Sequence, residues 1–310
     1  MSDAAPTIEI PPKRRWVLGI LSIFVLMLLY RFFAVYTVRS GECRPKPVDP
    51  SLRVTARQEQ GAAVSFPERV GFPEQQRPLV VMTYNVQGHA ALLRTDHIAR
   101  IAETIRSIRP DVVGINEAHR GTWQARFRDH TRELAERTGM NVAFGRSYEL
   151  WGGEFGNAVL TRGRIVRADV HELPAVGEPR SVLETEIDLD GARLNVYVTH
   201  LAAWRGWQRK PRTEQLECLS RHVRTSRYPY ILLGDLNATP SDPEIVAFGR
   251  MNAAQLCGAD LAPTHRVMNA RIDYIYADYG WEVRSTRVID AGPSDHYPVV
   301  AELLWQKNNH

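Results

Sequence analysis

The chain contains 310 residues, of which 44% are hydrophobic, and carries a formal net charge of +4. This length allows one large domain or two small ones, and the hydrophobic fraction is ordinary for a folded protein. The charge excess lies entirely in residues 1–77, with 11 Lys/Arg against 7 Asp/Glu, whereas residues 78–310 hold 28 of each. A neutral domain argues against tight, nonspecific binding to nucleic acid.

The three cysteines, Cys43, Cys218 and Cys257, exclude a disulfide framework, and their spacings match no zinc pattern. At most one bridge can form, so cysteine usage does not indicate the redox compartment. Cys218 falls in a predicted helix, where we interpret it as a packing residue.

The N-terminus predicts a membrane anchor. A short tail, residues 1–15, precedes residues 16–38, which are apolar apart from Arg31. As a helix this segment would span roughly 34 Å, enough to cross a bilayer once. The alternatives are a cleaved signal peptide and a buried helix, although a signal's apolar core is usually shorter. Basic residues flank both sides of this segment, so the positive-inside rule does not set its orientation. A single anchor followed by a long globular domain most simply places that domain outside the cytoplasm.

Proline-rich residues 39–77 are predicted to be a juxtamembrane linker, followed by a catalytic domain over residues 78–310. Apolar periodicity and turn residues predict many strands and fewer helices, which is typical of an α+β domain with large sheets. Helices are predicted at 96–109, 123–138, 212–224 and from 241, and strands near 112–115, 141–144, 157–161, 166–173, 182–188, 193–199, 230–233, 271–276, 283–289 and 298–304.

Polar side chains follow or begin these apolar runs. Buried strands rarely carry such groups at their ends by accident. Four acids, two amides and two imidazoles delivered to strand ends would make one polar pocket, suited to a hard metal ion and acid–base chemistry. In chain order they are Asn85, Glu117, His200, Asp235, Asn237, Asp273, Asp295 and His296.

Three short motifs carry this interpretation, each with a structural alternative. Asp235 and Asn237 are two residues apart and could orient a water or a phosphoryl oxygen, or form an Asx turn. Asp273 could accept a hydrogen bond from His296 and fix its tautomer, whereas a lone histidine is usually structural. Glu117 is a natural magnesium ligand or, alternatively, a cap or turn residue.

Together the ordered motifs resemble the endonuclease/exonuclease/phosphatase superfamily over about residues 79–305. The resemblance implies a four-layer α/β sandwich of two mixed sheets flanked by helices, and Mg²⁺-dependent hydrolysis of a phosphate ester, with Mn²⁺ as the alternative metal.

The resemblance also implies roles for individual residues. Asn85, Glu117 and Asp295 would lie at the metal, Asp235 would orient or deprotonate the attacking water, and Asn237 would bind the phosphate. His296, held by Asp273, would stabilise phosphoryl charge or transfer a proton. His200 matches a histidine of the nuclease and sphingomyelinase branches that assists the leaving group, and Asn157 matches a motif that supports substrate or site geometry.

Substrate choice depends on loops. Loop 201–212 carries Trp204, Arg205, Trp207 and Arg212. We expect the two arginines to bind substrate. These side chains could stack a base, contact a lipid interface, or be partly buried.

Three functions remain open at this point. The favoured one is a single-pass, membrane-anchored phosphodiesterase acting on a phospholipid or small headgroup diester. The second is a membrane-anchored endonuclease or exonuclease acting on DNA or RNA, and the third a nonenzymatic scaffold, which the intact polar set disfavours.

Overall fold

The fold is seen in a computed structural model that describes most of the chain after residue 77. The predicted anchor, residues 16–38, and most of the predicted linker lie outside the described residues. In the part that is described, no helix is long and apolar enough to cross a membrane. The described ranges are 39–40, 43–45, 77–203, 209–252, 254–258 and 262–306.

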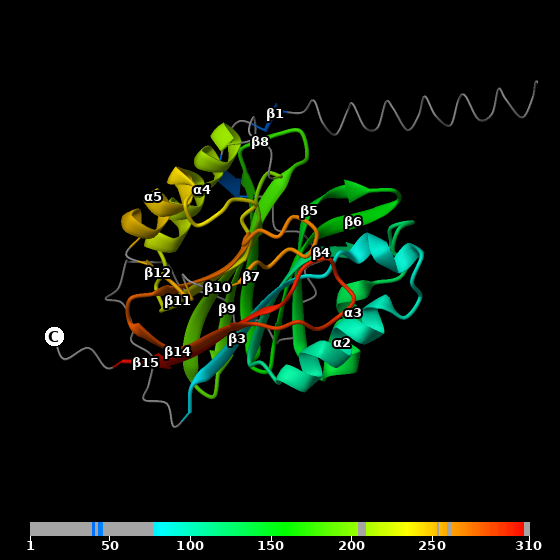
Figure 1. Ribbon diagram of the computed structural model, residues 1–310, viewed down its shortest axis with the longest axis horizontal. Helices are drawn as coiled ribbons and strands as arrows, with labels where there is room; N and C mark the ends of the chain where they lie inside the picture. The colour runs from blue at the N-terminus through cyan, green and yellow to red at the C-terminus, as the bar shows by residue number, and fades with distance from the viewer. Residues whose placement is uncertain are drawn as a thin grey trace, which may run out of the picture.

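Two mixed β-sheets form the body of the domain (Figure 1). In spatial order, the six-stranded sheet contains β14 (Trp281–Val288), β15 (Val299–Trp305), β3 (Leu79–Asn85), β4 (Val112–Arg120), β6 (Gly153–Thr161) and β5 (Asn141–Leu150). The seven-stranded sheet contains β12 (Ala254–Leu256), β13 (Asp273–Asp278), β11 (Tyr230–Asp235), β10 (Ala192–His200), β9 (Arg180–Leu189), β7 (Arg164–Leu173) and β2 (Arg44–Pro45). Only the β3–β4 and β10–β11 pairs are parallel among these described strands.

The sheets pack face to face, and helices cover their outer faces. The helices α2 (His97–Ile108) and α3 (His130–Thr138) lie over the six-stranded sheet, whereas α4 (Arg209–Arg224) and α5 (Pro243–Met251) lie over the seven-stranded one (Figure 1). A short 3-10 helix, η1 (Gly88–Leu92), follows β3. This arrangement confirms the predicted sandwich of two mixed sheets with flanking helices.

The middle of the sandwich is an apolar core. Side chains from both sheets interdigitate there, including Val198 and Leu233 of the large sheet and Val159 of the smaller one, all fully buried. The sheets approach closely at Gly114 of β4, where an added Cβ would lie 2.7 Å from Leu233 Cβ. Burying each such aliphatic side chain contributes about 1.5–3 kcal/mol.

Local sequence explains the helix boundaries. In α2, Ile98, Ile101 and Ile105 recur at helical spacing and are buried against the sheet. The predicted helix 123–138 begins instead at residue 130, because the Asp129 carboxylate caps that position by accepting bonds from the next backbone amides.

Residues before the domain also join the fold. β1 (Arg39–Ser40) pairs with β8 (Ala175–Val176) in a two-stranded sheet, and β2 pairs with β7. Cys43, between them, forms a disulfide with Cys218 of α4, and their Cα atoms are 5.7 Å apart. This part of the predicted linker is therefore attached to the catalytic domain.

Candidate active site

Strand register brings the predicted polar residues together. In the large sheet, His200 is the register partner of Asp235 across the parallel β10–β11 pair. Asp235 is in turn opposite Asp273, the first residue of β13. Each of these strands is buried along its length, so each places its polar end group at one edge of the sandwich.

Asp273 and His296 form a buried dyad. Asp273 Oδ2 accepts a hydrogen bond from His296 Nδ1 at 2.8 Å, and both side chains are more than nine-tenths buried. Burial alone would lower the pKa of His296, but the charge and hydrogen bond of Asp273 raise it to about 10. The dyad therefore holds a protonated imidazole whose Nε2 lies 3.8 Å from Asp235 Oδ2.

Asp235 lies at the centre of the constellation. Asn85 Nδ2 donates to its Oδ2 at 3.2 Å, and the Nε2 atom of His200 lies 3.5 Å from the same oxygen. Burial, followed by the negative charge of Asp273, raises the pKa of Asp235 to about 7. A carboxylate with this environment suits the acceptance of a proton.

His200 has the opposite electrostatic environment. Its pKa is held well below the usual range, first by burial and then by the positive charge of Arg180. Its Nδ1 atom is buried and has no hydrogen-bond partner among the described residues. The two site histidines therefore differ, with His200 neutral and His296 charged.

Glu117 projects from a bulge in β4. The register shifts between Ile115 and Ala118, and Glu117 has the left-handed φ of 58°. Its Oε1 accepts a hydrogen bond from Asn85 Nδ2 at 3.1 Å, and Oε2 lies 3.6 Å from His89 Nδ1. Burial would raise the pKa of Glu117, but the contact with His89 and the positive charge of His296 keep it well below its usual value. The bulge thus presents an ionised carboxylate.

Asp295 completes the acidic side of the site. Its side chain is 30% exposed, and its Oδ2 lies 3.9 Å from His265 Nε2. The neighbouring Ser294 Oγ donates to the Asn85 backbone carbonyl at 2.7 Å, which ties this loop to the end of β3.

An amide relay lies beneath the site, and sequence reasoning selected only one of its two asparagines, Asn157. Asn116 accepts a hydrogen bond from the Asp235 backbone N–H at 2.9 Å and donates to Asn157 Oδ1 at 2.9 Å and Thr199 O at 3.0 Å. Asn157 in turn donates to Ser181 O at 3.1 Å. Both asparagines are buried, so they join the two sheets under the catalytic edge rather than touching substrate. The available signal was Asn116 itself, a polar residue inside an apolar strand.

The constellation opens into a cavity of about 410 Å³. The predicted residues on its wall are Glu117, His200, Asp235, Asn237, Asp295 and His296. Asn237 is anchored there, since its Nδ2 donates to Leu201 O at 3.1 Å. The other residues that line it are His89, His119, Gln124, Tyr148, Leu150, Phe155, Glu178, Arg180, Ala203, His265, Met268 and Ile272.

Of the two predicted substrate-binding arginines, Arg212 is described and does not line the cavity. Arg212 on α4 is 4% exposed, and its Nη2 lies 3.1 Å from Glu244 Oε1 in a buried ion pair. Arg205 lies outside the described residues. The arginine that does line the cavity is Arg180, whose Nη1 lies 3.0 Å from Glu178 Oε1 and whose buried Nε has no partner in the described structure.

The residues present fit a hard divalent cation. Two carboxylates, Glu117 and Asp295, line the cavity. Asn85, predicted at the metal, contacts Glu117 through its Nδ2, and its Oδ1 accepts from the Gln87 backbone N–H, so the two carboxylates supply the ligand oxygens. Oxygen donors of this kind are those that Mg²⁺ prefers. A second compact set, the ligand atoms of Asp235, Asp273 and His296, lies within 4.8 Å of one another, but the dyad hydrogen bond already links two of its members.

Comparisons with known structures agree with the fold. One solved structure is an endonuclease/exonuclease/phosphatase from Beutenbergia cavernae, 25% identical with a TM-score of 0.64, covering 74% of this chain and 72% of that one. The human Nocturnin catalytic domain with bound sulfate is 21% identical with a TM-score of 0.61, covering 76% and 97%. A mannosyl-6-phosphatase from Bacteroides thetaiotaomicron is 20% identical with a TM-score of 0.58, covering 73% and 100%.

Sequence comparisons point the same way. The protein cwh43 of Schizosaccharomyces pombe is 30% identical over 138 residues, which are 44% of this chain and only 14% of the length of cwh43. Residues 82–296, most of the chain, match the model of the endonuclease/exonuclease/phosphatase family. The chain therefore belongs to that family of metal-dependent phosphate-ester hydrolases.

Proposed function

We propose that this protein is a membrane-anchored, metal-dependent phosphodiesterase that hydrolyses a phospholipid or a small headgroup diester with an activated water. The observation that supports this most directly is the gathering of Glu117, Asp235, His200 and His296 on the wall of one cavity. The family relationship supports the reaction class, whereas the substrate and the membrane are our inference.

The mechanism assigns each side chain one task. Asp235 accepts the proton of the attacking water, because its carboxylate is fixed by Asn85 and, through the backbone, by Asn116. His296, held protonated by Asp273, donates a hydrogen bond to the phosphoryl oxygen as negative charge develops. Neutral His200, on the other side of Asp235, hydrogen-bonds the leaving group.

Glu117 and Asp295, with Asn85 behind them, would hold the cation, which neutralises charge on the phosphoryl oxygens when bound. Glu117 is suited to this task because it remains ionised while partly buried. Asn237, anchored to Leu201, directs its side chain toward the position of the phosphate.

The shape of the cavity supports a small diester. Tyr148, Leu150 and Phe155 form an apolar part of its wall, and Arg180 supplies a positive charge. An apolar wall beside the positive charge of Arg180 suits the part of a phospholipid where the phosphate joins the glycerol or sphingoid group. The equal numbers of acidic and basic residues in 78–310 give no net attraction for a polyanion.

The anchor and the location rest on other observations. Residues 16–38 have the length and apolarity of a single membrane span. A disulfide between Cys43 and Cys218 supports placing the domain outside the cytoplasm, where such bonds persist.

The test compares substrates under one condition. The full chain in detergent, with Mg²⁺, should hydrolyse sphingomyelin or phosphoinositide vesicles and a soluble aryl phosphodiester, and should leave single-stranded oligonucleotides largely intact. Faster cleavage of DNA or RNA than of every lipid and small diester would overturn the substrate assignment in favour of a nuclease.

A further inference from the structure

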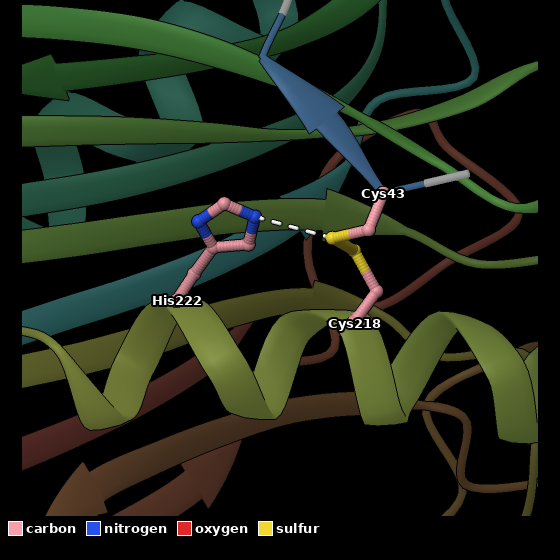
Figure 2. Close-up of side chains that lie close together, drawn as sticks. All are labelled: Cys43, Cys218 and His222. Atoms are coloured by element: carbon pink, nitrogen blue, oxygen red, sulfur yellow. Dashed lines mark hydrogen bonds between the residues drawn. A yellow bond between two sulfur atoms is a disulfide. The ribbon is translucent and has the colours of Figure 1, made fainter.

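A cluster of metal-ligating side chains lies away from the catalytic cavity. Figure 2 shows Cys218 and His222 projecting from the same helix, α4, toward Cys43, which precedes β2. Cys43 and Cys218 form a disulfide, and Cys43 Sγ lies 3.4 Å from His222 Nε2. One ligand atom from each of these three residues lies within 4.8 Å of the others. None of the three lines the catalytic cavity.

A second histidine, His171, and a carboxylate, Glu184, lie next to this cluster. The rings of His171 and His222 have centroids 4.0 Å apart. The Nε2–H of His171 donates to Glu184 Oε2 at 2.9 Å, which leaves Nδ1 as the free acceptor of a neutral ring. That Nδ1 is buried and has no hydrogen-bond partner within the described ranges. A buried imidazole nitrogen without a partner is costly unless it serves another purpose.

The spacing and distances fit zinc. Cys218 and His222 are four residues apart, so they share one face of α4. Zinc binds thiolate at about 2.3 Å and imidazole at about 2.0 Å in a tetrahedron, which places a sulfur and a nitrogen ligand roughly 3.5 Å apart. The 3.4 Å between Cys43 Sγ and His222 Nε2 matches that separation.

We propose that Cys43, Cys218 and His222 form a zinc site when the Cys43–Cys218 disulfide is reduced. His171, held by Glu184, packs against His222 outside this ligand set. A dithiol reductant supplies the two electrons and two protons that convert the disulfide to two thiols, and is itself oxidised to a disulfide. Zinc binding then displaces both thiol protons to solvent, leaving two thiolates and one neutral imidazole as ligands from the chain and a water at the fourth position.

Both states would attach the segment before the domain to α4. Cys43 and Cys218 are 175 residues apart, so either the bond or the ion closes the same long loop. The disulfide is the form expected outside the cytoplasm, and the zinc form is expected wherever a dithiol reductant and zinc are both present.

Metal binding by the full chain, before and after reduction, tests the proposal. The protein in detergent is reduced with a dithiol, separated from it without oxygen, and titrated with Zn²⁺ or Co²⁺. The reduced form should bind about one more zinc ion per chain than the oxidised form, and its Co²⁺ complex should show the intense visible and thiolate charge-transfer absorption of a tetrahedral site. The carboxylate-lined catalytic site cannot give that thiolate signal. Equal metal binding by both forms, or a Co²⁺ spectrum without thiolate absorption, would overturn the proposal.

Variants assign the ligands without removing the disulfide. His222→Asn should fold with the disulfide intact and, once reduced, lose the thiolate–Co²⁺ signal or bind Zn²⁺ at least about 100-fold more weakly. His171→Asn leaves all three ligands in place and should retain the signal. Cys257→Ser is the matched control, because Cys257 is a buried free thiol, and it should retain the signal. Full zinc affinity in His222→Asn would exclude this ligand set.

Discussion

Asp235 is the residue on which the contacts of the site converge. Its Oδ2 atom is approached by Asn85, His200 and His296, and its backbone N–H is held by Asn116. A proton acceptor fixed from several sides needs little reorganisation during reaction. The neighbours of Asp235 therefore position its carboxylate as well as taking part in the reaction.

The Asp273–His296 dyad gives a residue-scale prediction. His296→Ala should lower kcat by roughly 10²–10⁴-fold, as expected for loss of a group that acts on a transferred proton or developing charge. Asp273→Asn should also lower kcat, and the double variant should be little worse than His296→Ala, because Asp273 acts through the imidazole. Asp290→Asn, at a surface position whose side chain is 80% exposed, is the control. Additive losses in steady-state kcat would show that the two residues act separately.

At the catalytic end of the large sheet, β10 and β11 lie very close together, and this approach positions His200 and Asp235. Gly234, just before Asp235, has φ of +146°, and an added Cβ would lie 1.9 Å from the Thr199 carbonyl oxygen. Only a residue without a side chain allows β10 and β11 to run this closely together at their catalytic ends.

Replacing this glycine should damage the fold. Gly234→Ala should lower the free energy of unfolding by more than about 3 kcal/mol, because the clash is with backbone. Gly139→Ala is the matched comparison: Gly139 also has positive φ, but nothing lies within 4 Å of its added Cβ. Gly139→Ala should lower the free energy of unfolding by only about 1–2 kcal/mol. Equal urea midpoints for the two variants would contradict the close approach.

The start of α3 carries a buried histidine that should make stability pH-dependent. Burial, followed by the nearby His119, Arg128 and His97, lowers the pKa of His130 to about 3. An unfolded chain has an ordinary histidine pKa near 6.5, so below that pH the unfolded state binds one more proton. Stability is therefore fully present above about pH 6.5 and falls as the pH decreases toward 3.

Between pH 7 and pH 5, His130 should account for a loss of about 2 kcal/mol in the free energy of unfolding. Urea denaturation of the wild type and His130→Phe at both pH values measures this contribution, and the variant should lose less stability by that amount. Parallel pH dependences would show that His130 is not a buried neutral group.

The catalytic domain as a whole includes residues outside the boundary that the sequence indicated. Residues 39–40 and 43–45 pair with β8 and β7, and Cys43 closes a loop of 175 residues to α4. A covalent link over so long a separation chiefly restricts the unfolded chain.

Loss of this link should be visible in stability. Cys43→Ser should lower the free energy of unfolding of the oxidised protein by about 2–5 kcal/mol, whereas Cys257→Ser should change it much less. Chemical denaturation without reductant provides the measurement. Identical midpoints for Cys43→Ser and wild type would mean that the disulfide does not form in solution.

Much of this architecture could be predicted because apolar periodicity and strand-end polar residues are local signals. The strands leading to Asn85, Glu117 and Asp235 were predicted from such runs, and the structure places these three residues in contact. Asn116 was not selected, because its role depends on Asp235, 119 residues later in the sequence. Arg180 was not selected, because its effect on His200 depends on how β9 and β10 pair. The buried pairing of Arg212 with Glu244 was missed for the same reason: charge alone does not reveal its partner.

The central claim is that an ionised Glu117 and a divalent cation together support phosphate-ester hydrolysis in this cavity. The most direct measurement is the hydrolysis of a soluble aryl phosphodiester by the full chain, titrated with Mg²⁺ after treatment with a chelator. The exposed Glu136→Gln serves as control for Glu117→Gln. We predict that activity disappears in chelator, returns with Mg²⁺, and is lost by roughly 10²-fold or more in Glu117→Gln alone. Undiminished activity in chelator, or full activity of Glu117→Gln at low Mg²⁺, would contradict the account.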